Sequence, residues 1–548
     1  MGPIEDARAW MAQDSDPVTR AELDALVARS EAGDAAATEE LAARFSGRLE
    51  FGTAGLRGEL GAGPMRMNRV LVAQAAAGLA AYLRAREPHP TAVIGYDGRH
   101  NSAVFARDSA AILAGAGVET TLLPRQLPTP VLAFAVRELR ASAGIMVTAS
   151  HNPARDNGYK VYLGGGDEGS QIVPPADGEI AAEIVRASAV AFGDRPVSSD
   201  VKVAPESLVD AYVARTAAIA SDPQPLRYVY TPMHGVGLET AARVFAAAGF
   251  EAPIVVEQQA APDPDFPTVV FPNPEEPGAM DLAFALAAEH DADLVLANDP
   301  DADRVAVGIP DPRVEGGWRR LTGNEIGWLL GWRAAREATT GTLACSLVSS
   351  PALREIARVR GLGFVETLTG FKWISRAPGL IYGYEEALGY LVDPQKVRDK
   401  DGISAAVAVL SLFSELRAAG TTLDEHLDAF ALEFGAFASA QISIRVADLA
   451  DIPRAMSRLR ADPPTSIGGL AVDGVDDYLT GVDGFTPNDI LRLRTVGGGR
   501  VIVRPSGTEP KLKCYLDASS REGSAAERRA EAEVAVATLE AGMRALLG

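Results

Sequence analysis

The chain has 548 residues, of which 47% are hydrophobic and 23% are charged, as is typical of a globular protein with several hydrophobic cores. Its formal net charge of −21 argues against nucleic-acid binding, because phosphate contacts need Lys and Arg, and it requires an anionic substrate to bind at a locally basic site. Its two cysteines, Cys345 and Cys514, provide no disulfide framework and are typical of a reducing compartment.

The N-terminal segment, up to about residue 48, is expected to be helical. Thr19 and Glu22 have the spacing of a capping box and predict a helix over residues 21–32. This segment has neither a signal-peptide nor a myristoylation pattern. We expect no apolar run long enough to span a bilayer, since the longest, residues 70–83, is Ala-rich and interrupted by Gln74. These features predict a cytoplasmic protein that contacts no membrane.

From about residue 90 the chain alternates between two kinds of segment. Short β-rich apolar stretches end in Gly-, Asp- or Ser-rich loops, and Ala/Leu-rich helical stretches follow them. The apolar stretches are residues 91–97, 118–124, 145–150, 227–231, 294–299, 342–349, 363–367 and 380–385. This alternation predicts an α/β fold in which functional loops lie at the carboxyl ends of the strands.

The C-terminal part of the chain has a different character. Breaks near residues 193–206, 310–317 and 434–439 indicate domain boundaries. After the last break we expect a strand, a helix over 452–460, further strands with a turn at 497–499, and a final helix over 525–547. This order predicts a small α+β domain.

The first candidate motif in chain order is Phe51-Gly-Thr-Ala-Gly-Leu-Arg57-Gly58. Its glycines permit close backbone approach to a ligand, and Arg57 is an always-charged donor. The competing interpretation is a glycine-rich turn that leads into the next helix.

The second motif is Thr148-Ala-Ser150-His151-Asn-Pro153, which begins in the apolar stretch 145–150 and continues into the loop after it. Pro153 holds the loop out of regular structure, so Ser150 is expected at an exposed strand end. Ser and Asn are also common turn residues, and taken alone that interpretation is the stronger one. However, Lys160 lies on the return of the same loop. A hydroxyl nucleophile beside His151 and Lys160 suits proton transfer and anion stabilisation.

A glycine pair, Gly235 and Gly237, also follows an apolar stretch and opens a helix, and Glu257 lies about 20 residues further on, as in a dinucleotide-binding fingerprint. The third small position of that fingerprint is Thr240 here. We therefore do not expect a nicotinamide site.

The third motif, Asp299-Pro-Asp301-Ala-Asp303-Arg304, follows the apolar stretch 293–297. Three carboxylates this close repel one another unless a cation holds them, and carboxylate oxygens are the ligands that Mg²⁺ prefers. An EF-hand calcium loop is excluded, because Arg304 and Pro310 stand where that loop needs Gly and Glu. Mg²⁺ in proteins is usually bound by carboxylates together with phosphate oxygens. The motif therefore predicts a phosphate nearby, which a phosphorylated Ser150 would supply.

Three further motifs lie in the C-terminal half. Arg504-Pro-Ser506-Gly507-Thr508-Glu-Pro-Lys511 combines the parts of a phosphate-binding loop, although a Pro-Gly hairpin turn is the competing interpretation. In Gly383-Tyr-Glu385-Glu386-Ala-Leu-Gly389 the two carboxylates suit hydrogen bonds to sugar hydroxyls or acid–base work. Lys372 is a further basic candidate.

Taken together and in this order, these motifs resemble those of the α-D-phosphohexomutase superfamily, which contains the phosphoglucomutases and phosphomannomutases. The resemblance covers about residues 51–513. The N-terminal helix with Trp10, the form of the Glu385 loop and the chain length resemble the branch with type 2 phosphoglucomutases, phosphopentomutases and glucose-1,6-bisphosphate synthases.

This resemblance implies an α/β four-domain architecture around a central cleft: three α/β domains with mixed sheets and a C-terminal TBP-like α+β domain. The expected domains are residues 1–200 with the phosphoserine loop, 201–316 with the metal loop, 317–436 with the sugar loop and 437–548 with the phosphate loop.

The resemblance also implies roles for individual residues. Ser150 is expected to be the phosphoserine, assisted by Arg57, His151 and Lys160, and Mg²⁺ is expected to be held by Ser150, Asp299, Asp301 and Asp303. The expected substrate contacts are Thr53, Arg304, Lys372, Glu385, Glu386, Arg504, Ser506, Gly507, Thr508 and Lys511.

The implied reaction interconverts glucose 1-phosphate and glucose 6-phosphate through glucose 1,6-bisphosphate, which is both intermediate and activator. The expected partner is a sugar phosphate, and the protein is expected to be a monomer or a homodimer. Alternatives are a phosphomannomutase or phosphopentomutase, a serine phosphohydrolase, and a non-catalytic sugar-phosphate-binding protein.

Overall fold

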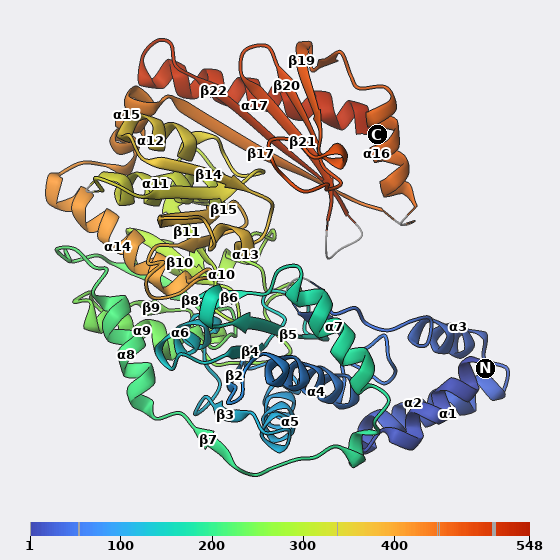
Figure 1. The fold of residues 1–548 in the computed structure, drawn as a ribbon. Coiled ribbons are helices and arrows are strands. Elements are labelled where there is room, and N and C mark those ends of the chain that lie inside the picture. Colours follow the sequence, from blue (N-terminus) through green and yellow to red (C-terminus); the bar gives the residue numbers. More distant parts are fainter. Residues whose placement is uncertain are drawn as a thin grey trace. The chain divides into compact units, whose positions relative to one another are not determined.

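The computed structural model describes residues 2–52, 55–336, 338–446, 448, 450–506 and 511–547. The chain forms two compact units. The N-terminal unit comprises Met1–Leu321, Phe371–Arg376 and Ala387–Ser414, and the C-terminal unit comprises Thr322–Gly370, Ala377–Glu386 and Glu415–Gly548. Each unit contains more than one sheet (Figure 1). The domain boundaries expected at residues 200, 316 and 436 stay predictions.

The first sheet of the N-terminal unit has the strand order β1-β5-β4-β2-β3-β7, with β6 beside β5. It is a mixed sheet, because β2 runs parallel to β3 and β4, whereas β5 is antiparallel to β4. Its strands are β1 (Leu56–Glu59), β2 (Thr91–Tyr96), β3 (Glu119–Leu122), β4 (Ala143–Val147), β5 (Asp156–Leu163), β6 (Ser170–Gln171) and β7 (Val201–Val203). The associated helices are α4 (Arg69–Arg86), α5 (Ser102–Gly115), α6 (Thr129–Glu138) and α7 (Ala176–Ala187).

The second sheet of this unit has the order β12-β11-β10-β8-β9 and is also mixed. Its strands are β8 (Tyr228–Thr231), β9 (Ile254–Val255), β10 (Leu294–Asn298), β11 (Val305–Pro310) and β12 (Trp318–Arg320). The helices are α8 (Glu206–Ala217), α9 (Gly237–Ala247) and α10 (Asp281–Glu289). Strand β10 is fully buried, so the loop that follows it begins inside the protein.

The N-terminal helices form a separate small core around Trp10, Leu23 and Leu41. They are α1 (Pro3–Gln13), α2 (Pro17–Glu31) and α3 (Ala35–Arg44). The predicted capping box is wrong: α2 begins four residues earlier than expected, because the Asp16 carboxylate accepts the Val18 N–H and Pro17 occupies the first helical position. Thr19 lies inside the helix, and its hydroxyl donates to Asp14 at 2.7 Å.

The C-terminal unit contains neighbouring strands in the order β14-β13-β15 and a separate antiparallel sheet in the order β17-β22-β21-β20-β19-β18. The first group is β13 (Thr342–Ser346), β14 (Gly363–Thr367) and β15 (Leu380–Glu385), with α11 (Gly323–Arg336), α12 (Ala352–Arg360) and α15 (Leu423–Phe434). Strand β16 (Gly389–Leu391), helix α13 (Phe371–Ile374) and most of α14 (Gly402–Ala419) belong to the N-terminal unit. The second group is β17 (Ala436–Arg445), β18 (Ser466–Ile467), β19 (Leu470–Asp477), β20 (Leu491–Thr495), β21 (Gly499–Pro505) and β22 (Lys511–Ser520), with α16 (Asp451–Ala461) and α17 (Ala525–Leu547).

Helix α14 corrects one expectation. By length and composition it is apolar enough to cross a membrane, so the expectation that no run is long enough for this is wrong. In the structure 72% of this helix is buried, which is typical of a core helix in a folded domain.

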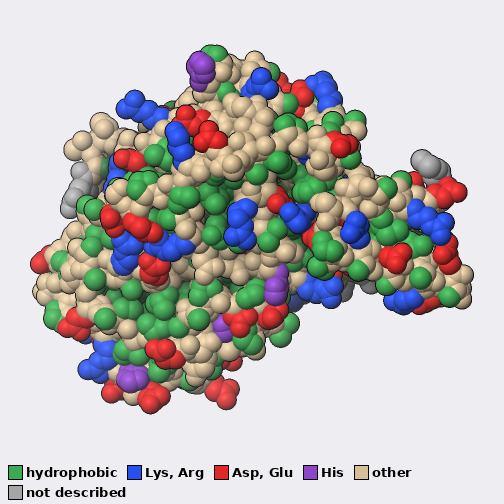
Figure 2. All heavy atoms as spheres, turned by 90° about the horizontal axis from the view of Figure 1, so that it is seen from below, with side chains coloured by type: hydrophobic (Ala, Val, Ile, Leu, Met, Phe, Trp, Pro, Cys, Tyr) green, Lys and Arg blue, Asp and Glu red, His purple; other side chains and the backbone are tan. Residues whose placement is uncertain are grey.

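Charged side chains of both signs are interspersed on the face of the protein shown in Figure 2. Across the described residues, many exposed charged side chains form ion pairs, such as Arg8 with Glu31 at 2.6 Å and Lys202 with Glu119 at 2.5 Å. Such exposed pairs add little stability, typically about 0–1 kcal/mol. Cations that bind an anionic ligand strongly are therefore expected among the buried side chains.

Candidate active site

Ser150 lies in the loop between β4 and β5. The backbone leaves the sheet after Val147, and the Ser150 N–H donates to Thr148 Oγ1 at 2.8 Å. Ser150 has a φ of +53°, in the left-handed region that non-glycine residues rarely adopt. Its relative exposure is 2%. The serine is thus held in a strained, enclosed position, as is common at functional sites.

The Ser150 hydroxyl has two polar partners. Its Oγ donates to Asp299 Oδ2 at 2.9 Å and lies 3.2 Å from His151 Nδ1. Burial, and then the positive charges of Arg304 and Arg57, lower the pKa of His151 well below its ordinary value. The lowered pKa keeps the imidazole neutral, so one of its ring nitrogens can accept a hydrogen bond.

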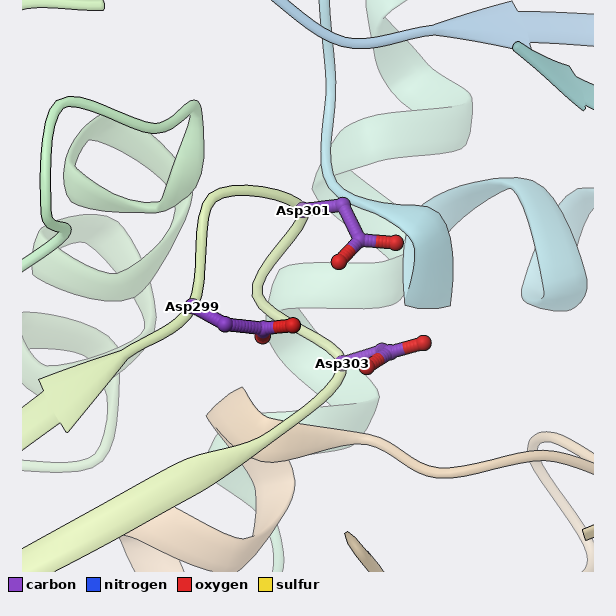
Figure 3. Close-up of side chains that lie close together, drawn as sticks. All are labelled: Asp299, Asp301 and Asp303. Atoms are coloured by element: carbon purple, nitrogen blue, oxygen red, sulfur yellow. The ribbon is translucent and has the colours of Figure 1, made fainter. Parts of the chain in front are cut away.

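The three aspartates of the third motif lie in the short loop between β10 and β11, and their side chains project toward a common side (Figure 3). One carboxylate oxygen from each lies within 4.8 Å of the others, and all three residues are fully buried. The loop is closed by the Ala302 N–H, which donates to Asp299 O at 2.8 Å, and by the Arg304 N–H, which donates to Asp299 Oδ1 at 3.0 Å.

Two lysines lie against these carboxylates. Lys160 Nζ contacts Asp301 Oδ2 at 2.7 Å and Asp303 Oδ2 at 2.8 Å, and Lys400 Nζ lies 3.2 Å from Asp303 Oδ2. Burial alone would lower the pKa of Lys160, but Asp301 and Asp303 raise it, so the ammonium stays charged. Burial alone would raise the pKa of Asp303, but Lys160 and Lys400 hold it below its ordinary value.

Asp299 is different, because its negative charge is not offset in the same way. Burial, and then the charges of Asp301 and Asp303, raise the pKa of Asp299 well above its ordinary value. A divalent cation at the three carboxylates would supply the missing positive charge.

The donor set fits such a cation. Asp301 Oδ1 and Asp303 Oδ1 are buried and, within the described part of the chain, have no hydrogen-bond partner. Buried carboxylate oxygens normally have hydrogen-bond partners, so these two oxygens are available to a ligand. Clustered carboxylate oxygens are the hard ligands that Mg²⁺ prefers. The acidic cluster is therefore suited to bind a metal ion.

The remaining predicted residues of the N-terminal unit lie on several elements. Arg57, on β1, donates from Nη1 to Asn152 Oδ1 at 3.2 Å, so it is joined to the Ser150 loop. Arg304 donates from Nη1 to Ala387 O at 3.0 Å, and its Nε lies 3.8 Å from Asp303 Oδ1. Lys372 lies on α13, with its Nζ 5.5 Å from the centre of the Trp373 ring.

The other predicted residues belong to the C-terminal unit. Glu385 Oε1 accepts the Gly370 N–H at 2.6 Å, and Glu386 Oε2 accepts the Ser346 and Ser349 hydroxyls at 3.1 and 3.0 Å. The Ser506 N–H donates to Lys511 O at 2.8 Å, which closes the base of the predicted phosphate loop, and Arg504 precedes it on β21. Thr53, Gly507 and Thr508 lie outside the described residues.

Sequence reasoning missed side chains that support the site. Thr129, the first residue of α6, donates from Oγ1 to Asp301 Oδ2 at 2.6 Å, and its N–H donates to Asp301 O at 2.9 Å. Lys400 was missed as well. Thr129 is separated from the aspartates by some 170 residues. Neither Thr129 nor Lys400 belongs to a recognisable motif. Lys400 does stand in an unusually charged segment, Arg398-Asp-Lys400-Asp401, and that run of charges was the available signal.

The glycine pair that resembles a dinucleotide fingerprint has another use. Gly235 lies between β8 and α9, Gly237 is the first residue of α9, and the Val236 N–H donates to Pro300 O of the aspartate loop at 2.9 Å. A Cβ atom on Gly235 would lie 2.3 Å from both Cα and O of Pro300. The glycine is therefore required because the two backbones approach so closely.

Replacing Gly235 with alanine is expected to destabilise the protein by about 1–3 kcal/mol and to weaken metal binding, because the aspartate loop must shift to make room. Urea unfolding with and without Mg²⁺ measures both effects. Gly178→Ala is the matched control, since a Cβ there meets nothing within 4 Å. Equal stability and equal metal response in the two variants would contradict this interpretation of Gly235.

Comparisons with known proteins identify the family of the chain. Residues 48–190, 208–312 and 322–433 match the phosphoglucomutase/phosphomannomutase alpha/beta/alpha domains I, II and III, and residues 442–535 match the C-terminal domain of the same proteins. The chain belongs to the phosphoglucomutase/phosphomannomutase family. The expected phosphohexomutase resemblance and the four-domain fold class are confirmed.

Individual members of this family carry different names. A probable phosphomannomutase of Haemophilus influenzae is 54% identical over 85% of this chain and 95% of that protein. A phosphopentomutase of Mus musculus is 35% identical over 95% of this chain and 91% of that protein. A crystal structure of a putative phosphomannomutase from Thermus thermophilus covers 91% of this chain and 99% of its own, with a TM-score of 0.70 at 23% identity, which shows the shared fold.

Membership of this family supports the reaction class of the protein. It is a sugar-phosphate mutase, an enzyme of the isomerase class. Its relatives bear the names of mutases for different sugars, so family membership does not determine the preferred sugar.

Proposed function

We propose that the protein interconverts glucose 1-phosphate and glucose 6-phosphate through a phosphorylated Ser150 and a glucose 1,6-bisphosphate intermediate. The observation that carries this proposal is the contact between Ser150 and the acidic cluster. Ser150 Oγ lies 2.9 Å from Asp299 Oδ2, at the edge of three buried carboxylates that suit Mg²⁺. A phosphoryl group on this oxygen would complete the ligand set that Mg²⁺ prefers.

Each half of the reaction exchanges a phosphoryl group for a proton. In the first half the bond between phosphorus and Ser150 Oγ breaks, a bond between phosphorus and the free sugar hydroxyl oxygen forms, and the hydroxyl proton ends on Ser150 Oγ. In the second half the other phosphate of the bisphosphate returns to Ser150, and the proton goes back to the sugar. His151 Nδ1, 3.2 Å from Ser150 Oγ, is positioned to pass this proton.

Charge at the transferring group is offset mainly by fixed cations. When bound at Asp299, Asp301 and Asp303, Mg²⁺ supplies positive charge to the phosphoryl oxygens and the bridging oxygen. Lys160 is charged and already lies against two of these carboxylates. It acts as a fixed cation, because its raised pKa prevents it from serving as a base near neutral pH.

The remaining residues are proposed to bind the sugar phosphate. We assign the sugar hydroxyls to Glu385 and Glu386, and the distal phosphate to Arg504, Ser506, Gly507, Thr508 and Lys511. Thr53, Arg304 and Lys372 are proposed as further contacts, and Arg57 as a donor to the transferring phosphoryl group. Because both phosphates of the bisphosphate must take the distal position in turn, that position must recognise a phosphate and not one particular sugar carbon. A cytoplasmic location and a monomeric or dimeric state remain part of this proposal.

A second candidate is a mutase for mannose or pentose phosphates. It is favoured by the names of relatives, a probable phosphomannomutase at 54% identity and phosphopentomutases at 35% identity. A phosphoglucomutase of Staphylococcus aureus is also 35% identical, over 87% of this chain, and supports the glucose assignment. Glucose and mannose differ at one hydroxyl, so few contacts decide between them.

Turnover of glucose 1-phosphate, mannose 1-phosphate and ribose 1-phosphate, each with a trace of its bisphosphate, tests the proposed substrate. We expect kcat/KM for glucose 1-phosphate to be highest by about tenfold or more, because a site built for a hydroxyl rejects a sugar that lacks it or misplaces it. Equal or higher values for mannose or ribose would transfer the assignment to the second candidate.

Two further measurements test the mechanism. Phosphopeptide mapping after incubation with glucose 1,6-bisphosphate is expected to find phosphate on Ser150. Release of inorganic phosphate is expected to be slow compared with isomerisation. Phosphate release at the rate of sugar-phosphate turnover would instead indicate a serine phosphohydrolase.

A further inference from the structure

The loop that carries Ser150 is held by one buried arginine. Arg99 follows β2, and its guanidinium faces the loop between β4 and β5. Nη2 donates to Ser150 O at 2.6 Å and to Asn152 O at 2.5 Å. Nη1 donates to Pro153 O at 2.8 Å and to Asp156 O at 3.2 Å. One side chain thus binds four backbone carbonyl oxygens between Ser150 and Asp156.

The arginine is itself fixed in place. Its side chain is 1% exposed, and its Nε lies 3.6 Å from Asp97 Oδ2. Asp97 Oδ1 in turn accepts the Ser102 hydroxyl at 2.7 Å and the Arg99 N–H at 3.0 Å. On its other side the guanidinium carbon lies 4.9 Å from the centre of the Phe266 ring. A side chain confined by an ion pair, an aromatic ring and its own backbone has few alternative positions.

The loop needs such a partner. Its backbone follows no regular ladder, and Ser150 has a positive φ that an isolated chain would leave. Buried carbonyl oxygens must find donors, and the planar guanidinium offers several in a fixed arrangement. A lysine would offer a single ammonium on a flexible stem, which does not reach four separated carbonyls together.

We propose that Arg99 is a positioning residue for catalysis: its guanidinium holds the Ser150 loop in the conformation that aligns Oγ with the sugar hydroxyl. This inference rests on the proposed phosphoserine mechanism. Among the described residues, Arg99 hydrogen-bonds neither to the acidic cluster nor to any residue assigned to the sugar or the distal phosphate. It therefore acts on the transfer step through the loop.

A defined pattern of kinetic effects follows. In Arg99→Lys the loop loses its alignment, and displacing a reacting atom by about 1 Å costs on the order of 100-fold in rate. We expect kcat to fall by about 100-fold while KM for the sugar phosphate changes by less than about threefold. A misaligned phosphoserine is also less well protected, so the ratio of phosphate release to isomerisation is expected to rise.

Arg195 provides a matched control. Its side chain is also buried, and its Nη2 donates to Ala187 O and Val190 O, each at 2.7 Å, away from the Ser150 loop. Arg195→Lys removes the same kind of contact and is expected to lower stability without changing kcat or the release ratio. Thermal unfolding of both variants identifies the part of any effect that comes from stability.

The experiment separates this inference from the proposed function. If the wild-type enzyme carries no phosphate on Ser150 after incubation with bisphosphate, the proposed function fails and the inference falls with it. If the wild-type enzyme is phosphorylated and active but Arg99→Lys keeps its kcat or matches Arg195→Lys, the inference alone is overturned. Should Arg99→Lys fail to fold, Asp97→Asn decides: it preserves the shape of the anchoring side chain and is expected to lower kcat by roughly tenfold with KM unchanged. An unchanged kcat in that variant would overturn the proposal.

Discussion

Mutase turnover is expected to fall to background when Ser150 is replaced by alanine. In the proposed mechanism this oxygen receives the phosphoryl group in one half of the reaction and gives it up in the other. Loss of a nucleophile that forms a covalent intermediate costs on the order of 10⁵-fold or more in kcat. A coupled assay for glucose 6-phosphate formation, run with excess bisphosphate, measures this loss.

Two observations keep this result specific. Ser150→Ala removes one hydroxyl, which donates to Asp299, and changes none of the three aspartates. The variant is therefore expected to stay folded and to keep most of its Mg²⁺ affinity. Ser109→Ala is the matched control, because that buried serine lies on α5 and donates to Phe105 O of the same helix, at 2.7 Å. Turnover of Ser150→Ala near that of Ser109→Ala would overturn the phosphoserine mechanism.

Much of the site was predictable from local sequence because its chemistry is concentrated in short loops. The spacing of Asp299, Asp301 and Asp303 predicted a cluster that the structure shows with oxygens within 4.8 Å of one another. The final helix, expected over 525–547, is α17 with the same bounds. In both cases the pattern and the physical cause lie within the same stretch of chain.

What could not be predicted depends on contacts between distant segments. Arg99 and Thr129 carry no local signal. Arg99 donates to backbone carbonyls of the Ser150 loop, and Thr129 donates to the carboxylate and the backbone carbonyl of Asp301. Gly235 gave a misleading signal for a similar reason. Its close approach to Pro300 resembles, in sequence, the close approach of a glycine to a dinucleotide. A glycine in a sequence indicates that another group approaches its backbone closely, but it does not identify that group.

The acidic cluster leads to the second large effect. Asp301→Asn keeps the size of the side chain and removes one negative charge. Asp301 Oδ1 has no hydrogen-bond partner among the described residues, so this oxygen is the one proposed to bind the metal. An amide is a weaker ligand and brings no charge. We expect the Kd for Mg²⁺ to rise by about 100-fold or more and kcat at low Mg²⁺ to fall in proportion.

Stability without metal is expected to respond differently from activity. Removing one of three adjacent carboxylates relieves repulsion, although it also costs Lys160 one of its two partners. These effects oppose each other, so apo stability should change little. In the wild-type protein, Mg²⁺ at 100 times its Kd adds about 2.7 kcal/mol to stability by mass action. In Asp301→Asn, at the same concentration, most of that gain should be lost.

Thermal unfolding over a Mg²⁺ series, with chelator as the zero point, measures this gain without requiring activity. Asp108→Asn is the control, because Asp108 is a partly buried carboxylate paired with Arg69 at 2.6 Å and lies outside the acidic cluster. The two variants should separate only as Mg²⁺ is added. A wild-type protein with no Mg²⁺-dependent stabilisation, or an Asp301→Asn variant that keeps all of it, would show that the unpartnered oxygens serve another purpose. The first of these results would leave Lys160 and Lys400 as the counter-charge that the buried aspartates need.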